Sequence, residues 1–316
     1  MPKIAILDDY TEMAFKMGDW SSLPDGFEVK AFTDSMVDPD ALVERLKDFD
    51  VICAMRERAP FPASVFERLP KLKLFNTSGM RNAAVDIAAA KARGVVVCGT
   101  NGSNWSTAEH TWALLLGSAR NVAHDDRMMR EGKWQTRICL DLRGLTLGLL
   151  GLGNIGAQVA SYAKAFGMNI IAWSQNLTKE RCEEIGATLV SKQELFSNAD
   201  FISIHMVLSE RSRGLVKAED LARMKPSAYL VNTSRGPIVD QDALLATLRA
   251  GAIRGAAIDV YAVEPLPADH PYRSLDNVLI SPHMGYVTED TFRMFHAGYI
   301  ENIKAWHSGA PVRVLA

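Results

Sequence analysis

The sequence predicts an α/β protein made of two doubly wound domains with parallel sheets. Short apolar runs alternate with amphipathic helical stretches along most of the chain, and a polar, glycine-containing break interrupts this alternation at residues 99–106. Alternating strands and helices are typical of βα units, whose strands pair in parallel. A chain of 316 residues is also longer than one hydrophobic core usually holds.

The first βα series occupies about the first hundred residues. It opens with the apolar run Lys3–Leu7, which predicts a buried strand. Helices at 41–46 and 85–90 then alternate with strands at 51–55, 72–75 and 95–98. This series has no closing element of its own, and the amphipathic stretch 289–307 predicts a helix that returns to complete it.

A long helix from Thr107 to beyond Asn121 precedes the second series, which starts at Leu145. Its strands are expected at 145–150, 169–173, 200–204, 228–232, 255–260 and 278–280. We therefore predict a discontinuous domain of residues 1–101 and 287–316, with a second domain of residues 102–286 inserted into it.

Composition excludes several classes of protein. The formal net charge of −2 gives no electrostatic reason to expect nucleic acid or an anionic membrane as a partner. No segment approaches the roughly 18 apolar residues of a membrane span, and the N-terminus lacks a signal-peptide pattern. We expect a cytoplasmic protein.

The cysteines are scattered and form no C-x-x-C pair, which predicts reduced core thiols rather than disulfides or a zinc site. They are Cys53, Cys98, Cys139 and Cys182. We expect no bound metal, because no cluster of potential ligands is evident.

The sharpest local signal is a glycine-rich turn, Gly151-Leu-Gly153-Asn154-Ile155-Gly156, between an apolar strand and a helical stretch. In this context the pattern predicts a dinucleotide-binding turn, although a glycine-rich turn without a ligand is the alternative. Gly151 would make the tight turn, Gly153 would let a pyrophosphate approach the backbone, and Gly156 would let helix and strand pack closely. The first N–H groups of the helix would bind the phosphates.

The next strand ends at Ser174, where an acidic residue usually binds the adenosine ribose of NAD. Serine removes the charge that repels the 2′-phosphate of NADP. However, no arginine follows at once, and the nearest cations are Lys179 and Arg181. NAD and NADP therefore both stay open as the cofactor.

Three polar residues, Arg235, Glu264 and His283, follow strands of the second series. Ligands of open α/β sheets bind beyond the carboxyl ends of the strands, so these residues are placed to converge. Arginine offers a planar fork for a carboxylate, histidine exchanges a proton near neutral pH, and a neighbouring glutamate favours the protonated ring. From spacing alone, solvated surface charges and a structural histidine are the alternatives.

Taken together, these motifs resemble the D-isomer-specific 2-hydroxyacid dehydrogenases over nearly the whole chain. The resemblance rests on residues 151–156, 231–240, 259–265 and 281–285. It implies a Rossmann-type cofactor domain inserted in a discontinuous flavodoxin-like substrate domain, and a homodimer. It also implies hydride transfer between NAD(P)(H) and a small 2-hydroxy or 2-keto acid of the glyoxylate or hydroxypyruvate type.

The same resemblance implies roles for individual residues. The family's catalytic set corresponds to Arg235, Glu264 and His283, with His283 as the general acid and base. Asp259 corresponds to the residue that holds the nicotinamide carboxamide, Thr107 to the segment under the nicotinamide, and His205 to the loop beside the adenine. Met80 and Arg81 correspond to the loop whose backbone N–H groups bind the substrate carboxylate.

The expected substrate pocket departs from the family pattern. The family usually has a second glycine where Arg81 stands, a small residue at Tyr286 and a proline at Val207. Arg56 is a candidate for binding a substrate anion, or else part of a solvated turn. Trp105 is a candidate for the pocket wall, or else an aromatic that packs at the hinge.

Other functions share parts of this pattern. A formate dehydrogenase is expected to have glutamine at position 264, whereas a phosphite oxidiser shares the three catalytic residue types. Long phosphoglycerate enzymes with a regulatory domain exceed this length. The alternative from another class is a non-catalytic NAD(H)-sensing module of the same fold that binds a protein partner.

Overall fold

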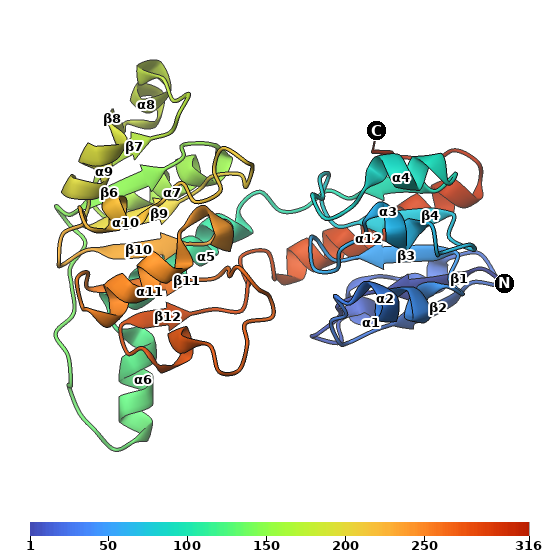
Figure 1. Cartoon of the computed structure of the whole chain (residues 1–316), viewed down its shortest axis with the longest axis horizontal. Helices are drawn as coiled ribbons and strands as arrows, with labels where there is room; N and C mark the ends of the chain where they lie inside the picture. Colours follow the sequence, from blue (N-terminus) through green and yellow to red (C-terminus); the bar gives the residue numbers. More distant parts are fainter. Residues whose placement is uncertain (316) are drawn as a thin grey trace. The chain divides into compact units, whose positions relative to one another are not determined.

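The computed structural model describes residues 1–315 and divides the chain into two compact units (Figure 1). Unit 1 comprises Met1–Ser103 and the residues from Thr288 onward, and unit 2 comprises Asn104–Val287. Each unit is built on a parallel sheet of its own. No helix within residues 1–315 is both long and apolar enough to cross a membrane.

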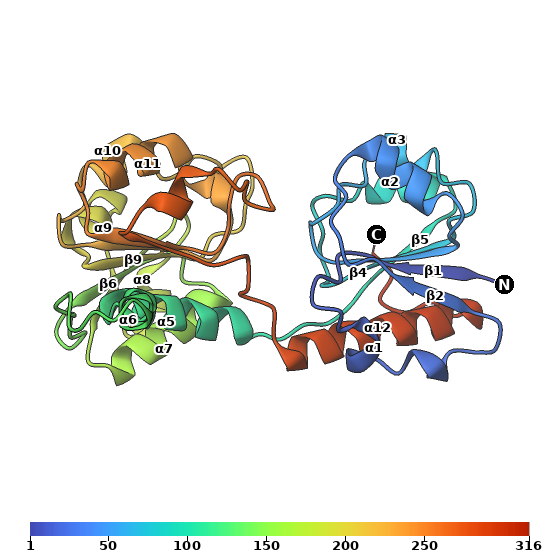
Figure 2. The same cartoon turned by 90° about the horizontal axis from the view of Figure 1, so that it is seen from below.

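Unit 1 contains a five-stranded sheet in the order β2-β1-β3-β4-β5. Its strands are β1 (Lys3–Ile6), β2 (Glu28–Ala31), β3 (Val51–Ala54), β4 (Leu74–Thr77) and β5 (Val96–Gly99). One face carries α1 (Ala14–Met17) and α12 (Glu289–His307), and the other carries α2 (Pro39–Leu46), α3 (Ala63–Phe66) and α4 (Ile87–Ala92) (Figure 2). A short 3₁₀ helix, η1 (Trp20–Ser22), follows α1.

Helix α12 is tied to the sheet of unit 1 by buried polar contacts as well as by packing. The Tyr299 hydroxyl donates to the carbonyl of Ala54 at 2.9 Å. The Asn302 amide donates to Asn76 Oδ1 and to the carbonyl of Gly99, both at 2.9 Å. Buried polar groups need such partners, so these bonds fix the helix against the strands. Residues far apart in sequence thus complete one domain.

Unit 2 contains a seven-stranded sheet in the order β12-β11-β10-β9-β6-β7-β8. Its strands are β6 (Thr146–Leu150), β7 (Asn169–Trp173), β8 (Thr188–Leu189), β9 (Phe201–Ile204), β10 (Tyr229–Asn232), β11 (Gly255–Ile258) and β12 (Val278–Ile280). Its helices are α5 (Ser106–Ala119), α6 (Val122–Arg130), α7 (Asn154–Ala165), α8 (Lys179–Ile185), α9 (Lys192–Asn198), α10 (Ala218–Leu221) and α11 (Gln241–Arg249), with η2 (Gly236–Ile238) and η3 (Pro271–Ser274). Helices cover both faces of the sheet (Figure 2), so the predicted fold class is confirmed.

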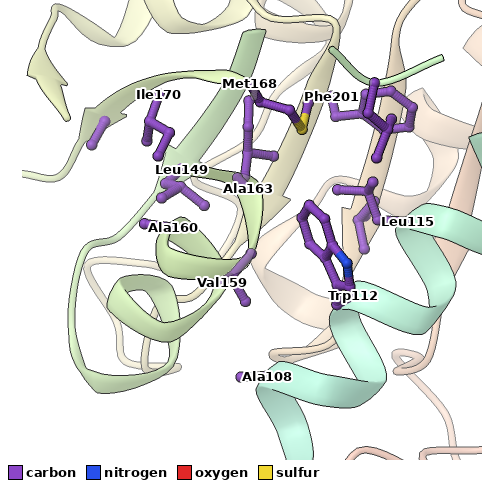
Figure 3. Close-up of a cluster of buried hydrophobic side chains, with 14 of the residues drawn as sticks. Ala108, Trp112, Leu115, Leu149, Val159, Ala160, Ala163, Met168, Ile170 and Phe201 are labelled. Atoms are coloured by element: carbon purple, nitrogen blue, oxygen red, sulfur yellow. The ribbon is translucent and has the colours of Figure 1, made fainter. Parts of the chain in front are cut away.

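A hydrophobic core lies between α5, α7 and one face of the unit 2 sheet (Figure 3). Trp112 and Leu115 of α5 lie beside Ala160 and Ala163 of α7, all at most 8% exposed. The alanines let α7 approach the sheet closely. A second core fills the opposite face, which explains why the strands read as continuous apolar runs.

Two expectations about local structure were wrong, and one strand was not predicted. The helix expected from Thr107 to beyond Asn121 is two helices, because Asn121 adopts a left-handed conformation (φ 52°) that ends α5 and redirects the chain into α6. Strand β2 was missed, because it lies at the sheet edge and has no fully buried residue. Cys139 is half-buried rather than in a core, whereas the other three cysteines are buried, and none of the four forms a disulfide.

Candidate active site

The glycine-rich turn joins β6 to α7, and its geometry requires glycine at both ends. Gly151 has φ 104°, and a Cβ there would lie 2.5 Å from the carbonyl oxygen of His205. A Cβ on Gly156 would lie 2.3 Å from the carbonyl oxygen of Gly151. Gly153 differs, because a Cβ there would have no atom within 4 Å. Its backbone therefore borders open space, which fits the close approach of a pyrophosphate.

Asn154 and Ile155 open α7, and they follow an N-cap, Gly153, that has no side chain to bind the first N–H groups. A helix of twelve residues with an uncapped N-terminus concentrates positive potential and free donors at that end. This end of α7 thus has the chemistry to bind a dinucleotide phosphate.

Ser174 and His205, which were expected to lie beside the adenosine of the cofactor, are at the carboxyl ends of β7 and β9. Ser174 directly follows β7 and is half-buried, and the sequence has no acidic residue at 174–176. His205 follows β9, and its Nε2 lies 2.9 Å from Ser203 Oγ. Desolvation lowers the pKa of His205 to about 4, so its ring is neutral at physiological pH.

Arg235, Glu264 and His283 all lie beyond the carboxyl ends of neighbouring strands, β10, β11 and β12. Asn232 holds the segment of Arg235, since its side-chain amide donates to the Arg235 carbonyl at 3.1 Å. The next residue, Gly236, packs so tightly that a Cβ there would lie 2.2 Å from the carbonyl carbon of Tyr261. The loops after β10 and β11 are therefore in direct contact.

The structure places Glu264 against His283. Glu264 Oε2 lies 2.6 Å from His283 Nδ1, and Glu264 Oε1 accepts a bond from the backbone N–H of Tyr261 at 2.9 Å. Both carboxylate oxygens are thus held, and they orient the imidazole through Nδ1. The ring nitrogen that remains for other chemistry is Nε2. Tyr286 packs its ring edge-on to His283, with ring centroids 5.6 Å apart.

Asp259 is fully buried, and its oxygens face the loop that carries His283. Oδ1 accepts from the N–H of Met284 at 2.7 Å, and Oδ2 accepts from the N–H of Gly285 at 3.0 Å. Burial raises the pKa of Asp259, but bonds from His110 and Ser281 outweigh it and lower the pKa below its ordinary value.

His110 also belongs to this cluster, although it was not predicted from the sequence. Its Nε2 lies 3.2 Å from Asp259 Oδ1 and 3.0 Å from Ser281 Oγ. The available signal was its spacing from Thr107, because residues three apart share a helix face. Thr107 itself lies beside the His283 loop, since a Cβ on Gly285 would be 3.3 Å from Thr107 Cγ2.

In unit 1, the loop after β4 contains Met80 and Arg81, both exposed. Gly79 has φ 89°, and its N–H donates to Thr100 Oγ1 at 3.1 Å, which holds the loop in a fixed turn. Within residues 1–315 the backbone N–H groups of Met80 and Arg81 have no protein acceptor. These two donors are available to an anion.

Arg56 follows β3 in unit 1 and lies over this loop. Its guanidinium Nη1 would be 2.5 Å from a Cβ on Gly79, and its backbone N–H donates to Ser78 Oγ at 2.8 Å. Position 79 therefore needs glycine for two reasons: its positive φ, and the room that the missing Cβ leaves for the Arg56 side chain. Trp105 belongs to unit 2, directly before α5, and is 47% exposed.

Residues 112–285 match the family model of the D-isomer specific 2-hydroxyacid dehydrogenase NAD binding domain. The chain belongs to this dehydrogenase family. A glyoxylate reductase from Korarchaeum cryptofilum is 36% identical to it over 297 residues, which cover 92% of this chain and 89% of that protein.

A D-3-phosphoglycerate dehydrogenase from Methanocaldococcus jannaschii is 37% identical to this family member over 308 residues. That alignment covers 96% of this chain but only 57% of the other protein. Among solved structures, a phosphoglycerate oxidoreductase from Vibrio cholerae has a TM-score of 0.93 and 36% identity, covering 98% of this chain and 100% of that one. The relatives thus share a reaction class while their names differ in substrate.

Proposed function

We propose that this chain transfers a hydride between a nicotinamide cofactor and a short 2-hydroxy or 2-keto acid of the glyoxylate or hydroxypyruvate type, with His283 as general acid and base. The observation that carries the proposal is the 2.6 Å contact between His283 Nδ1 and Glu264 Oε2. An imidazole oriented by a carboxylate through one nitrogen can exchange a proton through the other. The likeness to glyoxylate reductases supports the reaction class.

The cofactor, when bound, supplies or accepts the hydride. In the direction of reduction, protonated His283 donates a proton from Nε2 to the carbonyl oxygen of the keto acid. Glu264 stabilises the imidazolium and keeps Nε2 aimed, because Tyr261 fixes its second oxygen. In the direction of oxidation, neutral His283 takes the hydroxyl proton at the same atom.

Charged and backbone donors then orient the substrate. Arg235 is suited to bind the carboxylate through its planar fork and to polarise the carbonyl. The open N–H groups of Met80 and Arg81 supply further donors for a carboxylate. Arg56 adds positive charge over the same loop of unit 1. Orientation of this kind lowers the activation barrier of hydride transfer, because the entropy of alignment is lost on binding and not during the reaction.

For the cofactor, we assign the pyrophosphate to the Gly151–Gly156 turn and the start of α7. Ser174 and His205 are assigned to the adenosine end, and Thr107 and Asp259 to the nicotinamide end. The turn supports this assignment, since Gly153 leaves open space at the backbone. NAD is the family's cofactor, and the choice between NAD and NADP for this chain is open to measurement at Ser174.

The proposal is tested by following the absorbance of NADH, and separately of NADPH, with glyoxylate, hydroxypyruvate, pyruvate and a bulkier aromatic keto acid. We expect oxidation of at least one cofactor with a short keto acid. We expect His283→Gln to reduce kcat at least a thousandfold while the cofactor dissociation constant changes less than threefold. Wild-type turnover by His283→Gln would refute the role of His283. Cofactor binding with no turnover of any acid would instead favour a sensing module.

A further inference from the structure

A second histidine, His110, lies close to the loop that carries His283. It projects from the first turns of α5, and its side chain is 22% exposed. Its Nε2 approaches two groups of other segments, Asp259 Oδ1 at 3.2 Å and Ser281 Oγ at 3.0 Å. These contacts join α5 to the ends of β11 and β12, far apart in sequence. None of the catalytic steps proposed above uses His110.

The contact with Asp259 fixes which nitrogen of His110 carries a hydrogen. A carboxylate can only accept hydrogen bonds, so Nε2 must be the donor in this pair. The Ser281 hydroxyl lies 3.0 Å from the same nitrogen. With the N–H groups of Met284 and Gly285, three donors then converge on one fully buried carboxylate. A buried charge is stable only when it is paired in this way.

The loop held by Asp259, residues 283–285, contains a residue with a strained backbone conformation. His283 has φ 57°, a left-handed conformation that is strained for a non-glycine residue. The two residues after it are those whose N–H groups bind Asp259. These bonds oppose relaxation of the backbone at His283. Gly285 lies in contact distance of both Asp259 and Thr107, so the start of α5 closes the other side of the loop.

The direction of the His283 side chain depends on this backbone conformation. Glu264 reaches Nδ1 only while the ring is held where the left-handed backbone puts it. If Asp259 were free to rotate, the loop could relax and the 2.6 Å contact would lengthen. His110 is the side-chain donor on Asp259 that comes from outside the β11 and β12 loops, so it anchors the carboxylate to a helix.

We propose that His110 is a positioning residue for the catalytic histidine: through Asp259 it holds the 283–285 loop so that His283 keeps its contact with Glu264. This inference rests on the proposed function, because it needs His283 to be the acid and base. It assigns His110 no contact with substrate or cofactor. Its effect is larger on kcat than on the binding of substrate and cofactor.

The test compares His110→Ala with His110→Gln, because the glutamine amide nitrogen can occupy the place of Nε2 and donate to Asp259. We expect kcat to fall about tenfold or more in His110→Ala and to recover to within about threefold of wild type in His110→Gln. KM for the keto acid should change less than threefold in both. The dissociation constant of NADH should rise by a smaller factor than kcat falls, because Asp259 is also assigned to the nicotinamide end. His124→Ala, a histidine on the neighbouring α6 whose Nε2 contacts Thr136, is the matched control and should behave as wild type.

The split between kcat and binding separates positioning from simple loss of structure. A positioning role predicts that kcat falls more in His110→Ala than the binding of substrate and NADH weakens, and that His110→Gln restores kcat. Equal loss of kcat, NADH binding and thermal stability in both variants would overturn the inference.

The same experiment includes His283→Gln so that the two proposals fail separately. If His283→Gln is inactive while His110→Ala has wild-type kcat, only the role of His110 is refuted. If His283→Gln turns over normally, the acid–base assignment itself is refuted, and the role of His110 with it.

Discussion

At the scale of single residues, Ser174 is the position where the choice of cofactor is most directly open to test. It directly follows β7, and residues 174–176 include no carboxylate. The two nearest cations, Lys179 and Arg181, lie on α8 and pair with Glu183 at 3.6 Å and Glu184 at 3.0 Å. Exposed pairs of this kind are weak, so these cations can be diverted to a phosphate.

We expect Ser174→Asp to shift the preference toward NADH. A carboxylate at the end of β7 can accept hydrogen bonds from the ribose hydroxyls and repels a 2′-phosphate. The ratio of kcat/KM for NADH to that for NADPH should rise at least tenfold, which corresponds to about 1.4 kcal/mol. Steady-state kinetics with both cofactors measures it. Ser174→Asn, which is similar in size but uncharged, is the control, and an equal shift in both variants would contradict the electrostatic explanation.

At the scale of elements, two glycines of the turn between β6 and α7 have different roles. Gly156 is needed for stability, and Gly153 is needed for ligand binding. A Cβ on Gly156 collides with the Gly151 carbonyl, at 2.3 Å, whether or not a cofactor is present. A Cβ on Gly153 meets nothing within 4 Å, and its φ of −77° suits any residue. Gly156 is therefore required by the fold, and Gly153 only by a ligand.

We therefore expect Gly156→Ala to lower the free energy of unfolding by about 1–3 kcal/mol, as overpacking usually does. Gly153→Ala should leave this free energy within about 0.5 kcal/mol of wild type and weaken cofactor binding at least tenfold. Urea unfolding without cofactor and a fluorescence titration with NADH make the two measurements. Wild-type binding by Gly153→Ala would mean that the pyrophosphate does not approach this backbone.

The same elements show what sequence alone could and could not predict. The β6–α7 motif and α12 were predictable because apolar periodicity and turn residues are local signals. The break at Asn121 was not, since asparagine in a helical pattern gives no certain sign of a left-handed backbone. The edge strand β2 lacks the continuous apolar run that marks a strand buried on both faces.

The scale of the whole molecule adds contacts that no local pattern contains. Arg235, Glu264 and His283 could be named from motifs, but the role of Asp259 as an acceptor for Met284 and Gly285 depends on a loop about 25 residues away. His110 is farther still, 149 residues from Asp259. All of these residues lie in unit 2, and the fold of that unit brings their segments together, so their hydrogen bonds become visible only once the fold is known.

Two buried titratable residues of unit 1 affect stability at acid pH in opposite directions. His296 is 1% exposed among Trp20, Phe292 and Tyr299, neither ring nitrogen has a partner within residues 1–315, and burial lowers its pKa to about 4. Asp8 is 5% exposed, and burial raises its pKa to about 6, against weaker effects of Ser35, Arg58, Tyr10 and Arg45.

The signs follow from proton binding by the folded and unfolded states. The unfolded chain protonates His296 first, so stability falls as pH drops from about 6.5 to 4, by about 3 kcal/mol in total. The folded chain protonates Asp8 first, so stability rises by about 3 kcal/mol as pH drops from about 6 to 3.8. Over the shared range these two effects of unit 1 largely cancel, whereas the lowered pKa of His205 in unit 2 adds a further loss of stability as pH drops from about 6.5 to 4.

Single substitutions should expose each effect. His296→Leu removes only the loss of stability on acidification, so it should be more stable than wild type by about 2 kcal/mol at pH 5 and nearly equal to it at pH 8.

Asp8→Asn should be more stable than wild type at pH 8, by up to about 3 kcal/mol, and the difference should shrink by pH 4. Asparagine also tolerates the left-handed conformation of Asp8, φ 57°. Urea unfolding followed by tryptophan fluorescence at pH 8, 5 and 4 gives these values. If His296→Leu followed the wild-type pH profile, burial would not lower the pKa of His296 in the folded chain.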